Sequence, residues 1–170
     1  YEWIKMSKID FLKIIGISYL LFTFISAFLL RENFSIGLFI LVLIICVFTD
    51  LGGYIFGKFF KGPKLIKISP KKTYAGALGG FILSLVAAFI YLKYTTTGAA
   101  TYENLSIWIG MSLNKIYYLF VLVISLISQI GDLVISYFKR LAKVKDTGNI
   151  LPGHGGLLDR IDGIIFAIPF

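Results

Sequence analysis

Four long apolar runs restrict the fold of this sequence more than any other feature. They cover residues 13–30, 35–57, 76–94 and 116–138. A bilayer core of about 30 Å needs about 20 apolar residues per helix, so each run is long enough, or nearly so, for one crossing. Because 58% of the residues are hydrophobic and the mean hydropathy is +0.86, we predict an all-α, polytopic membrane protein.

A shorter apolar run at residues 161–170 is interpreted as the start of a fifth helix. We therefore expect about five transmembrane helices in a single membrane-embedded domain over residues 1–170. The first ten residues lack the features of a signal peptide, and the chain begins without Met and stops abruptly, so we expect a fragment. The single cysteine, Cys46, lies in an apolar run and is expected to be a packing residue without a disulfide partner.

The basic residues indicate which side of the membrane each loop faces, because cytoplasmic loops retain Lys and Arg. Of the 17 basic residues, only Arg31, Lys93 and Lys115 fall on the far side. The others precede the first run or lie in two loops, at about residues 58–75 and 139–160. This predicts a cytoplasmic N-terminus and two basic loops that face the same compartment. Anionic lipid headgroups can account for the net charge of +8, so we infer no nucleic-acid partner.

Two acidic residues lie inside apolar runs. Asp50 precedes Lys58 by eight residues, and Asp132 precedes Lys139 by seven, which places both acids about 10 to 12 Å below the cytoplasmic end of a helix. An ionisable group at this depth is costly unless it is paired, hydrated or metal-bound, so both are candidates for a functional site. Matching depths on two helices suggest one shared cavity.

The helical spacing of polar and small residues supports that cavity. One polar stripe, with intervals of three and four, consists of Ser125, Ser128, Gln129, Asp132, Ser136 and Lys139. Small residues recur at helical spacing on the second and third runs, at Gly53, Gly57, Gly76, Gly79 and Gly80. Each glycine by itself is explained by close helix packing.

The first cytoplasmic loop contains Ser69, Lys71, Lys72 and Thr73 directly before an expected helix. Hydroxyls, amines and free backbone N–H groups at a helix N-terminus suit a phosphate group. An ordinary charged anchor before a membrane helix is the alternative explanation.

The second cytoplasmic loop is more specific. It gathers basic groups at Lys139, Arg140, Lys145 and Arg160, and glycine and proline residues force turns between them. Carboxylates that can hold Mg²⁺ are Asp132, Asp146, Asp159 and Asp162. The combination predicts a nucleotide-triphosphate site, with Asp159 and Asp162, three residues apart, pointing the same way. A solvated charged loop with local salt bridges is the alternative.

The only histidine, His154, stands between Gly153 and Gly155 and has no helix or core to pack into. We interpret it as a substrate contact or a loop-fixing hydrogen bond, although a lone histidine is often structural. One His and one membrane-embedded Cys cannot supply the ligands of a zinc site.

These residues resemble the phosphatidate cytidylyltransferase (CDP-diacylglycerol synthase) family. The family signature S-x-x-K-R-x-x-x-x-K-D-x-G-x-x-x-P-G-H-G-G-x-x-D-R-x-D is matched without a gap from Ser136 to Asp162. An earlier block, from Asp50 through Ser69-Pro70-x-Lys72-Thr73 to Gly76, is similar to a second conserved block. The sequence departs at Ile135, where many members have Glu, and at Gly163, where many have Ser.

The resemblance implies transfer of a cytidylyl group from CTP to phosphatidic acid, with a Mg²⁺ site and K⁺ as a candidate second ion. Asp132 and Asp159 would be metal ligands, with Asp162 and Asp50 as further candidates. Lys145, Asp146 and His154 complete the predicted catalytic set. The predicted substrate-binding residues are Ser69, Lys71, Lys72, Thr73, Ser136, Lys139, Arg140 and Arg160. The resemblance also implies that N-terminal helices of the family are missing from this chain. We expect a multi-pass protein of the cell membrane, in contact with membrane lipids, with its active site facing the cytoplasm. Whether it forms a homodimer is left open.

Two other functions remain open from the residues. A CTP-dependent polyprenol or phytol kinase shares the membrane habit and the nucleotide, and would release CDP in place of pyrophosphate. An ion-coupled transporter using Asp50 and Asp132 would explain the membrane acids, but leaves the cluster from Ser136 to Asp162 without a role.

Overall fold

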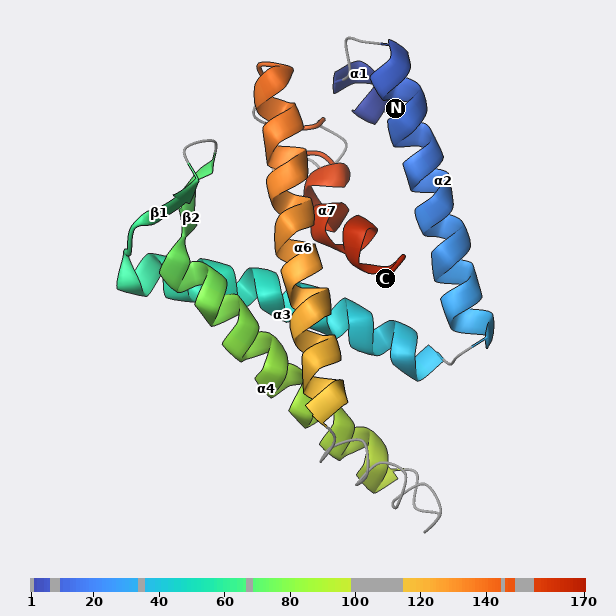
Figure 1. The fold of residues 1–170 in the computed structure, drawn as a ribbon, viewed down its shortest axis with the longest axis vertical. Coiled ribbons are helices and arrows are strands. Elements are labelled where there is room, and N and C mark those ends of the chain that lie inside the picture. Colours follow the sequence, from blue (N-terminus) through green and yellow to red (C-terminus); the bar gives the residue numbers. More distant parts are fainter. Residues whose placement is uncertain are drawn as a thin grey trace.

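The computed structural model describes residues 2–6, 10–33, 36–66, 69–98, 115–144, 146–148 and 155–170. Its helices are α1 (Glu2–Met6), α2 (Asp10–Asn33), α3 (Ile36–Phe60), α4 (Tyr74–Gly98), α6 (Lys115–Leu141) and α7 (Leu158–Ala167). Two short strands, β1 (Lys64–Ile66) and β2 (Ser69–Thr73), lie between α3 and α4. Figure 1 shows the helices crossing one another at steep angles, with the strands at one end of the α3–α4 pair.

Four helices are long and apolar enough to cross a membrane: Phe11–Asn33, Ile36–Phe60, Tyr74–Thr95 and Lys115–Leu141. They coincide with the four predicted apolar runs, so the polytopic all-α fold is confirmed. The predicted start of a fifth helix is α7, which has ten residues and is shorter than a membrane crossing requires. Four helices, rather than about five, therefore have the length of a crossing in the described parts of the chain.

Helices α3 and α4 form the most extensive helix pair, because glycines let their backbones meet. A Cβ on Gly52 would stand 2.4 Å from the carbonyl oxygen of Gly79, and a Cβ on Gly76 would stand 2.7 Å from the carbonyl oxygen of Gly53. Helix α6 packs against this pair, and α7 packs along α6, where a Cβ on Gly163 would stand 2.4 Å from Ser128 Oγ.

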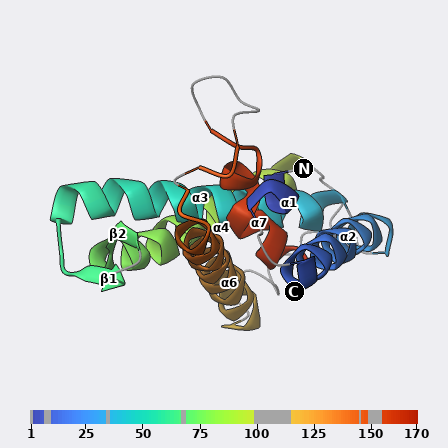
Figure 2. The same cartoon turned by 90° about the horizontal axis from the view of Figure 1, so that it is seen from above.

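The buried apolar core joins α3, α4, α6 and α7. Its fully buried members include Ile45, Cys46, Val121 and Ile124, which confirms Cys46 as a packing residue. A smaller cluster formed by Trp3, Ile135, Leu158 and Ile165 connects α1 to α6 and α7. Helix α2 stands beside α7, on the side away from α6 (Figures 1 and 2), and exposes most of its apolar surface, as expected of a helix that faces lipid.

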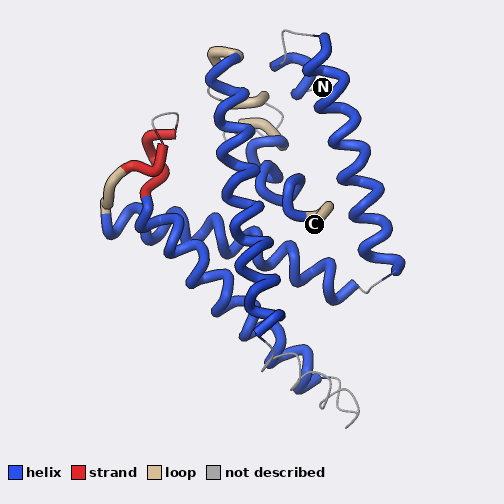
Figure 3. The backbone as a smooth tube through the Cα atoms, viewed as in Figure 1, coloured by secondary structure: helices blue, strands red, loops and turns tan. Residues whose placement is uncertain are grey.

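The loop predicted at about residues 58–75 contains a β-hairpin, which the sequence reasoning did not anticipate. Lys64 pairs with Thr73 and Ile66 with Ser69 in antiparallel register. The hairpin is coloured as strand in Figure 3, where it rises from the end of α3 and returns to the start of α4. It therefore brings Lys72 and Thr73 back toward the helices.

Candidate functional site

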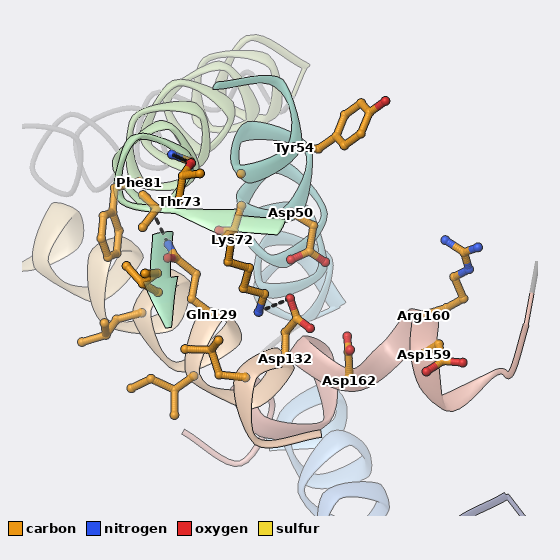
Figure 4. Close-up of a pocket in the computed structure, with 18 residues that line it drawn as sticks. Asp50, Tyr54, Lys72, Thr73, Phe81, Gln129, Asp132, Asp159, Arg160 and Asp162 are labelled. Carbon is orange, nitrogen blue, oxygen red and sulfur yellow. Dashed lines mark hydrogen bonds and ion pairs between the residues drawn. The ribbon is translucent and has the colours of Figure 1, made fainter. Parts of the chain in front are cut away.

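A cavity of about 560 Å³ lies between α3, β2, α4, α6 and α7. Its lining is mixed: Asp50, Lys72, Asp132 and Asp162 are ionisable, whereas one wall is apolar and consists of Phe81, Leu126, Ile130 and Leu133. Figure 4 shows the ionisable side chains of three helices and one strand converging on one end of the cavity. The predicted sharing of one cavity by Asp50 and Asp132 is confirmed.

The hairpin supplies the positive charge at this end of the cavity. Lys72 Nζ forms an ion pair with the carboxylate of Asp132, which belongs to α6. The next residue, Thr73, accepts a hydrogen bond from the backbone N–H of Gly76 at 3.1 Å and so satisfies one of the free amides at the start of α4. Lys72 and Thr73 both line the cavity, where a substrate group would meet them.

Asp50 lines the cavity from the part of α3 that packs against α4. Gly53 and Tyr54, three and four residues after Asp50, line the same cavity. The close approach of Gly76 to Gly53 fixes this part of α3 against α4. Asp50 therefore faces Lys72 and Asp132 from a rigid helix pair (Figure 4).

Helix α6 divides its predicted polar stripe between the cavity and the helix interfaces. Gln129 and Asp132 line the cavity; Gln129 Nε2 donates to the carbonyl oxygen of Ala77 at 3.3 Å, and Ser136 Oγ donates to Asp132 at 3.4 Å. Ser125 and Ser128 are instead fully buried between helices. The stripe is thus part of the site in the C-terminal half of α6 and a packing surface nearer its N-terminus.

Asp162 is the carboxylate of α7 that faces Asp132. Its side chain is 6% exposed, and its Oδ1 accepts a hydrogen bond from the Gly163 N–H at 2.8 Å. Burial, followed by the negative charges of Asp132 and Asp50, raises the pKa of Asp162 above its usual value. Three carboxylates therefore line the same end of the cavity, a region that favours a cation.

Asp159 lies one turn earlier on α7 and also lines the cavity, but its carboxylate is directed toward its own loop (Figure 4). Its Oδ1 accepts from Lys139 Nζ at 2.9 Å, and its Oδ2 accepts from the backbone N–H groups of Thr147 at 2.9 Å and Gly156 at 3.1 Å. Burial by itself would raise the pKa of Asp159, but these hydrogen bonds and the charge of Lys139 hold it below its usual value. The expectation that Asp159 and Asp162 point the same way is not met, because the loop amides capture Asp159.

The remaining predicted residues of the second loop lie around this core. Arg160 lines the cavity on its exposed side, Arg140 is exposed at the end of α6, and Asp146 is exposed in the loop. Lys145 and His154 lie outside the described residues, as do the side chains of Ser69 and Lys71 in β2.

One residue at the site was missed by the sequence reasoning. Glu2 is 7% exposed, and its carboxylate accepts hydrogen bonds from Leu157 N–H at 2.9 Å, Leu158 N–H at 2.8 Å and Thr147 Oγ1 at 3.2 Å. It therefore holds the loop that also holds Asp159. Glu2 and Leu157 are 155 residues apart in the sequence, and no local sequence pattern indicates a contact over such a distance.

The donor set fits Mg²⁺ in its chemistry. Carboxylate oxygens are the protein ligands that Mg²⁺ prefers, and the ion is commonly held by one or two of them together with substrate phosphates. In the described part of the chain, no three His, Cys, Asp or Glu side chains already form a metal-binding cluster. Asp132 with Asp162 or Asp50 thus offers the partial carboxylate set that a phosphate-bridged Mg²⁺ requires.

The sequence matches known proteins over most of its length. The profile of the cytidylyltransferase family covers residues 3–170. A phosphatidate cytidylyltransferase of Staphylococcus haemolyticus is 43% identical over 122 residues, which are 71% of this chain and 42% of that protein. A phosphatidate cytidylyltransferase of Haemophilus influenzae is 39% identical over 137 residues, 79% of this chain and 44% of that protein. The chain spans less than half the length of these relatives, and it belongs to the cytidylyltransferase family.

Proposed function

We propose that this chain carries the nucleotidyl-transfer site of a phosphatidate cytidylyltransferase, which converts CTP and phosphatidic acid into CDP-diacylglycerol and pyrophosphate. The observation that carries the proposal is the two-sided cavity. Its ionisable end suits phosphates and a cation, and its apolar wall belongs to membrane-spanning helices. The names of the relatives in Staphylococcus and Haemophilus support the same reaction.

The apolar wall accounts for a lipid substrate. Phe81 comes from α4, and Leu126, Ile130 and Leu133 come from α6. Acyl chains that lie between these helices keep the lipid phosphate at the level of Lys72, so the headgroup need not leave the membrane. A water-soluble acceptor would have no use for this wall.

In the reaction, a phosphate oxygen of phosphatidic acid attacks the α-phosphorus of CTP. The new bond joins that oxygen to the α-phosphorus, and the bond between the α-phosphorus and the bridging oxygen to the β-phosphorus breaks, so pyrophosphate leaves with the bonding electron pair. The attacking oxygen is already anionic, so no general base is required. The protein must position the two phosphates and offset the charge that develops on the leaving group.

The side chains of the cavity have distinct roles in this proposal. Lys72 lies where it can leave Asp132 and neutralise a substrate phosphate, and Arg160 lies on the exposed side, where pyrophosphate departs. Lys139 holds Asp159 in place, and Thr73 offers a hydroxyl beside the start of α4. Among the residues outside the described parts, Lys145, His154 and the side chains of Ser69 and Lys71 keep their predicted roles in binding the nucleotide and the headgroup.

Mg²⁺ would be held by Asp132 together with Asp162, with Asp50 beside them. When bound, it would screen the phosphates of CTP and polarise the α-phosphoryl group. Asp159 remains a candidate ligand, but its carboxylate would first have to give up hydrogen bonds within its own loop. We propose that the site opens to the cytoplasm, because most of the basic residues lie on its side of the predicted spans.

The direct test is a product assay with the protein in detergent micelles. CTP, phosphatidic acid and Mg²⁺ should give CDP-diacylglycerol and pyrophosphate in equal amounts, and omission of the lipid should abolish pyrophosphate release. Release of CDP with a phosphorylated lipid would instead show a kinase. Absence of any lipid product from active CTP turnover would refute transfer to phosphatidic acid.

A further inference from the structure

Helix α7 lacks an N-terminal cap of its own. The residue at its N-cap position is Leu157, whose side chain makes no capping hydrogen bond. The first backbone N–H groups of a helix have no partner within the helix and must be satisfied from elsewhere. The amides of Leu157 and Leu158 are satisfied by Glu2, which lies in α1 at the other end of the chain.

Two described stretches of the second loop, residues 146–148 and 155–158, surround the Glu2 carboxylate. Leu157 N–H binds Oε1, while Leu158 N–H and Thr147 Oγ1 bind Oε2. Glycines allow the loop to close around it, since a Cβ on Gly148 would stand 2.8 Å from Oε1 and one on Gly156 would stand 2.9 Å from the same atom. A negative charge at a helix N-terminus is also stabilised by the helix dipole.

The neighbour of Glu2 fixes α1 in place. Trp3 donates its indole N–H to the carbonyl oxygen of Leu12 at 3.0 Å and packs edge-to-face on Phe138 of α6, with ring centroids 5.2 Å apart. The indole ring also fills the space beside Gly16 of α2. Helix α1 is thus bound to α2 and α6, and Glu2 is presented to the loop from a fixed position.

Glu2 and Asp159 hold the same short stretches of backbone. Thr147 donates its hydroxyl to Glu2 and its N–H to Asp159. Gly156 donates its N–H to Asp159, and the next two amides donate to Glu2. The place of Asp159, and with it the salt bridge to Lys139, therefore depends on a loop that Glu2 closes.

We propose that Glu2 is a positioning residue. Its carboxylate caps α7 from a distant part of the chain and ties residues 147–148 of the second loop to residues 156–158, and thereby sets Asp159 and Lys139 for binding the nucleotide. Its link to nucleotide binding rests on the proposed function, whereas its role in closing the loop does not. Partners that orient the groups of an active site are costly to remove, commonly by about 10- to 100-fold in affinity or activity.

The test compares Glu2→Ala and Glu2→Gln with Glu32→Gln in the full chain. Gln keeps the shape of the side chain and one carbonyl oxygen, so it guards against a variant that fails to fold. Glu32 is exposed at the end of α2, which makes Glu32→Gln a control for loss of one negative charge. Each protein is studied by amide hydrogen exchange and by kinetics with CTP and phosphatidic acid.

Hydrogen exchange tests loop closure without any enzymatic activity. In Glu2→Ala, the amides of residues 146–148 and 155–160 should exchange on the order of tenfold faster than in the parent chain, because their buried acceptors are lost. Glu2→Gln should be intermediate, and the amides of α3 and α4 should be unchanged in both. Exchange of the loop at the parent rate in Glu2→Ala would overturn the proposal.

Kinetics tests positioning. In Glu2→Ala the KM for CTP should rise by about tenfold or more, whereas the KM for phosphatidic acid should stay within about twofold, since the apolar wall is not touched. A smaller folded fraction would change neither KM, so unchanged KM values in an active Glu2→Ala variant would overturn the positioning role. A parent chain that forms no CDP-lipid would refute the proposed function, and the exchange comparison would still decide whether Glu2 closes the loop.

Discussion

Lys72 of the hairpin and Asp132 of α6 form an ion pair across the mouth of the cavity. Lys72 lies in β2, directly before α4, and Asp132 lies in the C-terminal half of α6; each side chain is about one-quarter exposed. Neutralising a carboxylate on a membrane-spanning helix lowers the cost of its burial. Lys72 therefore stabilises the fold by neutralising Asp132, and the same charge is available to bind an anionic substrate.

Replacement of this lysine should impair catalysis strongly. Lys72→Met removes the charge that would stabilise the transferred phosphates, and we expect CTP-dependent product formation to fall by about 100-fold or more. Lys64→Met is the matched control, because Lys64 is exposed on the partner strand, and its activity should stay within about twofold. Initial rates of CDP-diacylglycerol formation measure both, and equal rates for the two variants would contradict the role of Lys72.

The choice of metal ligands can be tested by thermal unfolding. Mg²⁺ with CTP should stabilise the parent chain by about 2.7 kcal/mol when the ligand is present at 100 times its dissociation constant. In Asp132→Asn and Asp162→Asn this stabilisation should be largely lost, and in Glu32→Gln it should be kept. A full shift in Asp162→Asn together with loss in Asp159→Asn would instead identify Asp132 and Asp159 as the ligands.

The contact between α3 and α4 predicts opposite effects of alanine at adjacent glycines. Gly52→Ala would drive a methyl group into the backbone of Gly79, and overpacking of this kind costs about 1–3 kcal/mol. Gly53→Ala meets its nearest atom at 3.8 Å, so it should be neutral or stabilise the helix by up to about 1 kcal/mol. Melting temperatures in one detergent measure both variants, and equal melting temperatures would show that the helices separate without cost.

A buried hydrogen bond between α3 and α6 should show non-additive mutational effects. Thr49 Oγ1 and Ser125 Oγ are 2.8 Å apart, and both side chains are essentially inaccessible. Thr49→Val and Ser125→Ala should each lower stability, whereas the double variant should cost less than their sum. Hydrogen bonds in membrane proteins give coupling energies of about 0.6 kcal/mol, at most about 1.7. A double-mutant cycle by thermal unfolding measures the coupling energy, and a value of zero would show that this hydrogen bond does not stabilise the contact between α3 and α6.

The predicted topology can be tested with single cysteines in a Cys46→Ala background. Lys64→Cys in the hairpin should react with a membrane-impermeant maleimide in inverted vesicles and remain unlabelled in intact cells. Lys115→Cys, at the opposite end of its span, should show the reverse pattern. Labelling of both residues from the same side would contradict the placement of the hairpin and the start of α6 on opposite faces.

The membrane spans were predictable from the sequence because the bilayer imposes a length and a composition that local patterns report. The runs that became α3 and α6 carried Asp50 and Asp132 at matching depths, and one cavity followed from that match. The two helices are therefore the part of the site that sequence periodicity defines best.

Other parts of the site depend on partners that lie far apart in the sequence. The hairpin that carries Lys72 has a first strand of three residues, too short for an alternating pattern to stand out. The capture of Asp159 by loop amides and the capping of α7 by Glu2 depend on tertiary contacts, which helical spacing cannot report. For this reason, spacing alone predicted a common direction for Asp159 and Asp162, whereas the loop turns one of them aside.

The hairpin is joined to the membrane-spanning helix α4 without an intervening linker. A single residue, Thr73, separates Lys72 from the first residue of α4. The Thr73 hydroxyl accepts a hydrogen bond from the Gly76 N–H in the first turn of that helix. The position of Lys72 therefore follows that of α4, whereas the position of its partner Asp132 follows that of α6. A change of tilt between these two helices, of the kind by which spans adjust to bilayer thickness, would therefore alter the spacing of the two charges directly.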